Sequence, residues 1–98
     1  MIPVSLVPAR DPRCESCRLG DELVVLDGRG QVLRGINRVG ARVWELIDGM
    51  RSVDAIAGQI ATEFEQDEGR VLAEVSRFVE QLQACALVQL AAPTGGAT

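Results

Sequence analysis

The sequence predicts an α+β fold, winged-helix-turn-helix-like, in which a three-stranded antiparallel sheet is followed by three α-helices. Between residues 13 and 36, short apolar segments alternate with glycine-containing turns, as in a meander of strands. After residue 36 the apolar positions recur every three or four residues, which is the period of amphipathic helices. The 98 residues are enough for one domain with a modest core.

Residues 1–12 are expected to form an extended arm ahead of this domain. They contain Pro3, Pro8 and Pro12, and proline lacks the amide hydrogen that a helix interior or a central strand requires. The domain itself is expected over residues 13–90. Residues 91–98 include the segment Pro-Thr-Gly-Gly and have the composition of a disordered tail.

Three strands are expected in the meander, over residues 13–19, 22–27 and 31–36. The middle segment, Glu-Leu-Val-Val-Leu-Asp, is apolar on both faces and therefore belongs in the centre of the sheet. The third segment alternates in polarity over Val32-Leu33-Arg34, which suits an open edge. Gly35, near the end of this segment, is expected to loosen or bulge that edge.

Three helices are expected after the sheet. Asn37 and Ser52 are suitable N-caps for the first two helices, and Gly49 ends the first. The third helix follows the polar stretch 65–69, whose acids suit the positive end of a helix dipole. Its apolar side consists of Val71, Leu72, Val75, Phe78, Val79 and Leu82. A brief strand or extended segment is expected over residues 87–90.

The composition argues against several classes of function. The chain has no histidine, which excludes a Ser-His-Asp triad and every zinc site that contains histidine. No apolar run is long enough to span a bilayer and the N-terminus does not read as a signal peptide, so a cytoplasmic protein without membrane association is expected. The sequence contains no catalytic constellation or phosphate loop, so neither enzymatic activity nor a cofactor or metal is expected.

Cys14 and Cys17 have the one spacing that could carry thiol or metal chemistry, because a CxxC pair can supply half of a zinc site or a redox disulfide. Only Cys85 remains as a third thiolate, and no helix begins after residue 14, so neither kind of site is complete. Structural roles are therefore expected. Cys17 would pack beside Leu19 against the core, Cys14 would face outward, and Cys85 would be a small buried residue.

A basic cluster lies between residues 28 and 44, where four arginines occur without an acid: Arg29, Arg34, Arg38 and Arg42. Guanidinium groups can hold phosphates or the carboxylates of an acidic peptide. The alternative is surface pairing with Glu45 and the acids of the third helix. The second half of the chain has the opposite character, since residues 52–98 carry two arginines against seven acids.

A winged-helix regulator that binds DNA is the alternative function, because the same layout would place the third helix in a major groove. That helix carries only Arg70 and Arg77 against four acids, Asp67, Glu68, Glu74 and Glu80. Docking it onto DNA would bring net negative charge to the phosphates. Nucleic acid is therefore not the expected partner.

The junction between the third strand and the first helix resembles a known family. It reads Gly-Ile-Asn-Arg-Val-Gly-Ala-Arg-Val-Trp-Glu-Leu-Ile-Asp-Gly over residues 35–49, followed by Arg-Ser-Val-Asp-Ala-Ile over residues 51–56. This is similar to the PqqD-like peptide chaperones, also called RiPP recognition elements, whose pattern is Leu/Ile-Asn-x-x-Gly-x-x-Val/Ile-Trp-x-Leu-Ile/Leu-Asp-Gly and then Ser/Thr-Val-x-x-Ile. The resemblance covers about residues 20–88 and implies the same sheet and helices.

The resemblance implies a non-catalytic function, which is to bind the leader of a ribosomally made precursor peptide and present its core to a modifying enzyme. That enzyme would be a radical SAM maturase or a leader peptidase with a cyclase. The leader would add as an extra strand along the third strand, in the cleft beside the third helix. The implied peptide-binding residues are Gln31, Val32, Leu33, Arg34, Gly35, Ile36, Val71, Leu72, Val75 and Val79.

Further expectations accompany this assignment. Acidic leader residues are expected to meet Arg34, Arg38 or Arg42. Trp44 is expected in the core or at the cleft floor, Gly40 is expected to permit close packing, and Phe78 and Leu82 are assigned to the core. The chain is expected to act in trans, and pairing of the open edge with a second copy, as a homodimer, is an alternative use of that edge.

Overall fold

The predicted meander forms a three-stranded antiparallel sheet. β2 (Glu15–Leu19), β3 (Glu22–Leu26) and β4 (Val32–Ile36) are neighbours in that order in the computed structural model, which describes residues 3–92. The most apolar strand, β3, is central as predicted, and it buries Leu23, Val24 and Val25. β2 and β4 are the edges of this sheet.

Glycine and aspartate set the two turns of the meander. Gly20 has a φ of +64° in the turn between β2 and β3, a left-handed conformation that glycine adopts without strain. In the second turn, Asp27 Oδ1 accepts the backbone N–H groups of Arg29 and Gln31, both at 2.8 Å, and Gly30 has a φ of +86°. These turns fix the register, in which Leu26 is opposite Val32.

Three helices follow, and their first residues are set by side-chain caps. They are α1 (Arg38–Leu46), α2 (Val53–Phe64) and α3 (Glu68–Ala84). The caps Asn37, Ser52 and Asp67 each accept a backbone N–H from three residues further along the chain. The predicted caps of α1 and α2 are therefore confirmed. No helix within residues 3–92 combines the length and apolar character needed to cross a membrane.

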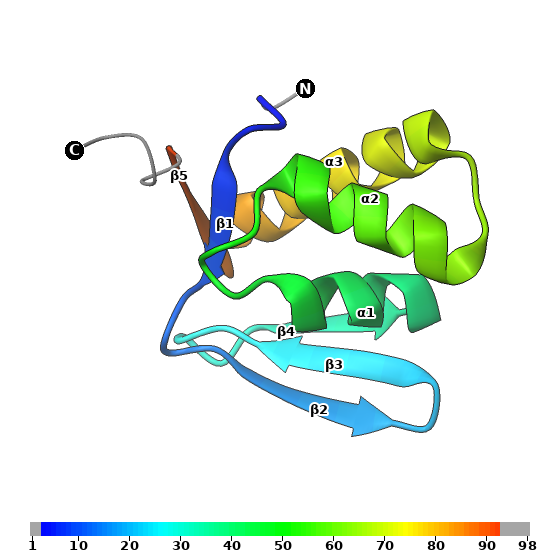
Figure 1. Ribbon diagram of the computed structural model, residues 1–98. Helices are drawn as coiled ribbons and strands as arrows, with labels where there is room; N and C mark the ends of the chain where they lie inside the picture. Colours follow the sequence, from blue (N-terminus) through cyan, green and yellow to red (C-terminus); the bar gives the residue numbers. More distant parts are fainter. Residues whose placement is uncertain (1–2, 93–98) are drawn as a thin grey trace.

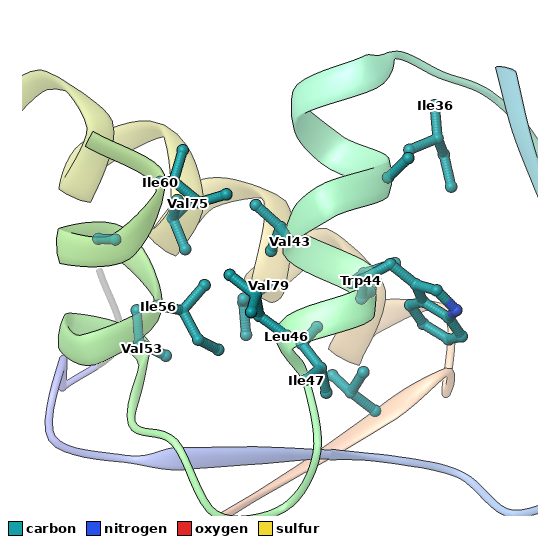
Figure 2. Close-up of a cluster of buried hydrophobic side chains, with 14 of the residues drawn as sticks. Ile36, Val43, Trp44, Leu46, Ile47, Val53, Ile56, Ile60, Val75 and Val79 are labelled. Atoms are coloured by element: carbon teal, nitrogen blue, oxygen red, sulfur yellow. The ribbon is translucent and has the colours of Figure 1, made fainter. Parts of the chain in front are cut away.

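α1 lies between the sheet on one side and α2 and α3 on the other (Figure 1). Figure 2 shows Val43 of α1 directed toward Val75 and Val79 of α3, whereas Trp44 lies on the sheet side of α1. Trp44 was predicted either in the core or at the cleft floor. It is 2% exposed and belongs to the core. One continuous core therefore spans both faces of α1.

The N-terminal arm contains a strand that the sequence did not predict. β1 (Val7–Arg10) pairs antiparallel with β5 (Val88–Ala91), and these two strands form a separate sheet. Proline is tolerated within β1 because a two-stranded sheet leaves one edge of each strand unpaired. β5 confirms the short strand expected after α3 and extends to Ala91, whereas residues 93–98 of the predicted tail lie outside the described residues.

The arm is also attached to the helices. The carbonyl oxygens of Val4, Leu6 and Pro8 accept N–H groups from the segment that joins α1 to α2 and from the start of α2. Arg10 donates from Nε to the Ile47 carbonyl at 3.0 Å, and its guanidinium carbon lies 5.0 Å from the centre of the Trp44 ring. Residues 3–10 are therefore part of the folded unit and not a separate arm.

The cysteines lie differently from the prediction. β2 is exposed along its whole length, so Cys17 and Leu19 face solvent. The residues of β2 on the inner face of the sheet are instead Ser16 and Arg18, which lie opposite Val25 and Leu23. Cys14 is instead half-buried against the core, and burial raises the pKa of its thiol. Cys85 is exposed at the end of α3 and not buried.

Candidate functional site

A groove of about 340 Å³ lies between β4, the first half of α1 and α3. β4 contributes its last four residues, Asn37 follows as the cap of α1, and α3 contributes one side over three turns. The residues that line the groove are Leu33, Arg34, Gly35, Ile36, Asn37, Val39, Gly40, Val43, Val71, Glu74, Val75, Phe78 and Gln81. The groove thus brings together the two segments that the resemblance pairs as a peptide cleft.

Just over half of the residues that line the groove have apolar side chains, and these lie at two depths. Four side chains are at most 5% exposed and form its floor: Ile36, Val43, Val71 and Val75. Three more are partly buried and remain accessible to a ligand: Leu33, Val39 and Phe78. A ligand that placed apolar side chains here would therefore remove these three from water.

Gly40 determines how closely the strand and the helices meet at the groove. A Cβ atom at this position would lie 2.8 Å from Ile36 Cγ2 and 3.6 Å from Phe78 Cζ. The first distance is too short for a real contact, so only glycine lets the end of β4 pack against α1 in this way. The close packing predicted for Gly40 is confirmed.

On α3, two of the four predicted site residues line the groove. Val71 and Val75 do so, whereas Leu72 lies outside the groove and Val79 is fully buried in the core. Phe78, which the sequence analysis assigned to the core, is only partly buried and forms part of the groove wall. Residues three and four apart share one side of a helix, so Val71, Val75 and Phe78 face the groove together while their neighbours turn away.

The predicted residues of β4 also divide into two groups. Leu33, Arg34, Gly35 and Ile36 line the groove. Gln31 and Val32 lie beyond its end, beside a smaller hollow of about 60 Å³ to which Leu33 also belongs. The predicted edge therefore runs from this hollow into the groove.

The backbone of Val32 faces away from the sheet. The N–H of Asp27 donates to the carbonyl of Gln31 at 2.9 Å, so Gln31 bonds toward β3. In an antiparallel pair, successive residues alternate between facing the partner strand and facing outward. The N–H and C=O groups of Val32 are consequently directed to the open edge of β4.

Of the three arginines expected to contact a ligand, Arg34 alone lines the groove. Arg42 instead donates from Nε and Nη2 to the two carboxylate oxygens of Glu63 on α2, at 2.8 and 2.9 Å. The guanidinium carbon of Arg38 lies 5.8 Å from the centre of the Phe64 ring. Arg38 and Arg42 thus contact the C-terminal half of α2 and not the acids of α3 that the alternative named. Arg42 also pairs with Glu45 at 3.7 Å, which is the part of the surface-pairing alternative that the structure confirms.

Several lining residues were absent from the sequence-based set, namely Asn37, Val39, Gly40, Val43, Glu74, Phe78 and Gln81. For α3 a signal existed, because Glu74, Phe78 and Gln81 continue the helical spacing of Val71. For α1 the glycine was a signal, since glycine in a helix often marks a close approach. Val39 and Val43 of α1 line the groove because of the angle at which the helix packs across the sheet. The amphipathic pattern of the helix does not specify this angle.

Comparison of the sequence with known protein families finds a match that covers the groove. Residues 22–88 match the family described as "Coenzyme PQQ synthesis protein D (PqqD)", which is more than half of the chain. The chain belongs to the PqqD family. The matched region of this PqqD-family chain contains β3, β4 and all three helices, and therefore every residue that lines the groove.

The fold is also similar to that of a solved structure, TbiB1 in complex with the TbiA(beta) leader peptide. The TM-score is 0.72, the sequence identity is 23%, and the alignment covers 83% of this chain and 94% of that chain. At this identity the likeness concerns the fold, and the predicted α+β arrangement of sheet and helices is confirmed. A search of curated protein sequences finds no match.

The Arg42–Glu63 pair generates a prediction about acid stability. Hydrogen bonds from Arg42 and Gln59 lower the pKa of Glu63 from 4.5 to about 2. Because this pKa is lower in the folded chain than in the unfolded chain, the stability from the pair is present above pH 4.5 and is lost as the pH falls toward 2. Glu63→Gln should therefore flatten the fall of the melting temperature across this acidic range.

The measurement is thermal unfolding followed by circular dichroism at a series of pH values. Glu65→Gln is the control, because it removes a charge from an exposed residue just past the end of α2. Parallel profiles for the wild type and Glu63→Gln would contradict the assignment.

Proposed function

We propose that this PqqD-family chain binds the leader segment of a ribosomally synthesised precursor peptide and presents the peptide to a modifying enzyme, without catalysing a reaction itself. The observation that carries the proposal is an apolar groove that adjoins an open strand edge. Peptides that add a strand to a sheet gain affinity from main-chain hydrogen bonds and gain specificity from pockets for alternate side chains. β4 and the groove offer both.

The main-chain part of this recognition would begin at Val32. Its N–H and C=O groups are directed away from β3, and its side chain is 51% exposed. A leader in extended conformation can bond to these groups without displacing any hydrogen bond of the sheet. The solved TbiB1 structure, which contains a leader peptide and shares this fold, supports a leader as the ligand.

The side-chain part would take place in the groove. Leu33, Val39 and Phe78 are partly exposed there, so they suit one or two apolar leader side chains. Arg34 is the arginine at the groove that suits an acidic leader residue. The modifying enzyme would be a radical SAM maturase or a leader peptidase with a cyclase, and either can receive a leader held in this way.

A first prediction concerns Phe78. Phe78→Ala should weaken leader binding about tenfold, because it removes the largest accessible apolar side chain of the groove. Leu72→Ala is the matched control, since Leu72 is also a half-buried side chain of α3 but lies outside the groove. Its affinity should stay within about twofold of the wild type. The assay is fluorescence anisotropy with a labelled synthetic leader of a candidate precursor peptide from the same genome.

Equal losses in Phe78→Ala and Leu72→Ala would count against the groove as the binding site, provided that circular dichroism shows both variants to be folded as the wild type is. Unchanged affinity in Phe78→Ala would exclude contact between the leader and this wall.

A second prediction concerns charge. Arg34→Glu should weaken leader binding by about fivefold to tenfold, and added salt should reduce the affinity of the wild type, because an exposed ion pair is screened. Arg29→Glu makes the same charge change at an exposed position in the turn before β4, outside the groove, and should have a smaller effect. If both variants bind as the wild type does at low salt, Arg34 does not meet an acidic leader residue.

A further inference from the structure

β4 is an irregular strand, and the irregularity lies within the groove. Leu23 of β3 pairs with Ile36, whereas Val25 pairs with Leu33, so the register shifts by one residue between these pairs. Arg34 and Gly35 therefore both lie opposite Val24, which is the arrangement of a β-bulge. Gly35 has a φ of +77°. The bulge expected at this edge from the sequence is confirmed.

The bulge determines which side chains of β4 reach the groove. In a regular strand, residues three apart point to opposite faces of the sheet. With one residue added, Leu33 and Ile36 both lie opposite inner-face residues of β3, and both line the groove. A regular register would turn one of these two side chains to the outer face.

A side chain from the neighbouring strand holds this bulge. The N–H of Gly35 donates to Glu22 Oε1 at 2.9 Å. Glu22 is the first residue of β3, is half-buried, and does not line the groove. A carboxylate acceptor makes a stronger hydrogen bond than a neutral one, and here it satisfies the amide of a bulge residue.

The conformation of Gly35, and not its surroundings, is what requires glycine at this position. A Cβ atom there would meet nothing within 4 Å, so a substitution is opposed by the positive φ alone. The hydrogen bond to the Glu22 carboxylate stabilises this backbone conformation from outside β4.

We infer that Glu22 is a positioning residue for the peptide-binding edge. By holding the Arg34–Gly35 bulge, it keeps Leu33 and Ile36 on the groove side and directs the N–H of Gly35 away from any ligand. Regular main-chain pairing with a bound peptide then stops before Arg34, and beyond that point the peptide is held by its side chains in the groove. This inference rests on the proposed function, because it concerns how the same site recognises its peptide.

The test compares three variants of the full chain. Glu22→Ala removes the acceptor, Glu22→Gln keeps an acceptor oxygen at the same reach, and Glu15→Ala removes a carboxylate from β2, on the same sheet. Binding of the same synthetic leader, from a candidate precursor peptide of the same genome, is measured by calorimetry. Hydrogen exchange of the Gly35 amide is measured in the free protein by NMR.

Glu22→Ala should weaken leader binding by about fivefold to tenfold and speed exchange at Gly35, whereas the other two variants should remain within about twofold of the wild type. Rescue by Glu22→Gln distinguishes positioning through the hydrogen bond from a contact that depends on charge. If Glu22→Ala folds poorly, Glu22→Asp replaces it, since the shorter side chain keeps the charge but loses the reach.

The two proposals fail in different ways. No binding by the wild type would overturn the proposed function, and the inference with it. Binding by the wild type together with unchanged affinity in Glu22→Ala or Glu22→Asp would overturn the inference alone. Faster exchange at Gly35 without any loss of affinity would show that the bulge is held by Glu22 but does not position the peptide, which also overturns it.

Discussion

The close contact between Ile36 and Gly40 is the constraint on which the rest of the site depends. It joins the last residue of β4 to the first turn of α1 at a separation that no side chain at position 40 would allow. Asn37, between them, caps α1 by accepting the Gly40 N–H at 2.9 Å. α1 is thereby fixed across the sheet, and the space beside it becomes a groove that Phe78 of α3 closes from the other side.

An open strand edge beside a groove with apolar walls is a liability, because it can pair with other chains. Here the edge is interrupted by the Arg34–Gly35 bulge, which disrupts regular pairing with another chain. Two arginines next to the site differ in whether they are bonded to another side chain. Arg42 is bonded to Glu63 of α2, whereas Arg34 stays at the groove, so positive charge is available where a peptide would lie.

Local chemistry made much of this fold predictable. Several features act only on residues close to them in sequence, and a short stretch of sequence is therefore enough to predict them. They are the caps Asn37 and Ser52, the turn glycines and the apolar strand β3. β1 was missed because its partner β5 lies about eighty residues further along the chain. Phe78 was predicted in the core and Val79 in the groove, but Phe78 lines the groove and Val79 is buried in the core. The sequence could not separate them, because a wide apolar stripe on a helix does not indicate which of its sides packs in the core.

Peptide binding along β4 is tested most directly by an amide NMR titration of the isotopically labelled chain with the leader of its precursor peptide. Saturable shifts are predicted at Val32 and Leu33, and on the side of α3 that contains Val71, Val75 and Phe78, with little change in β2. This pattern would place the leader on the open edge and in the groove together. Saturable shifts confined to β2 or to the exposed side of α2, with β4 unchanged, would contradict binding at this site.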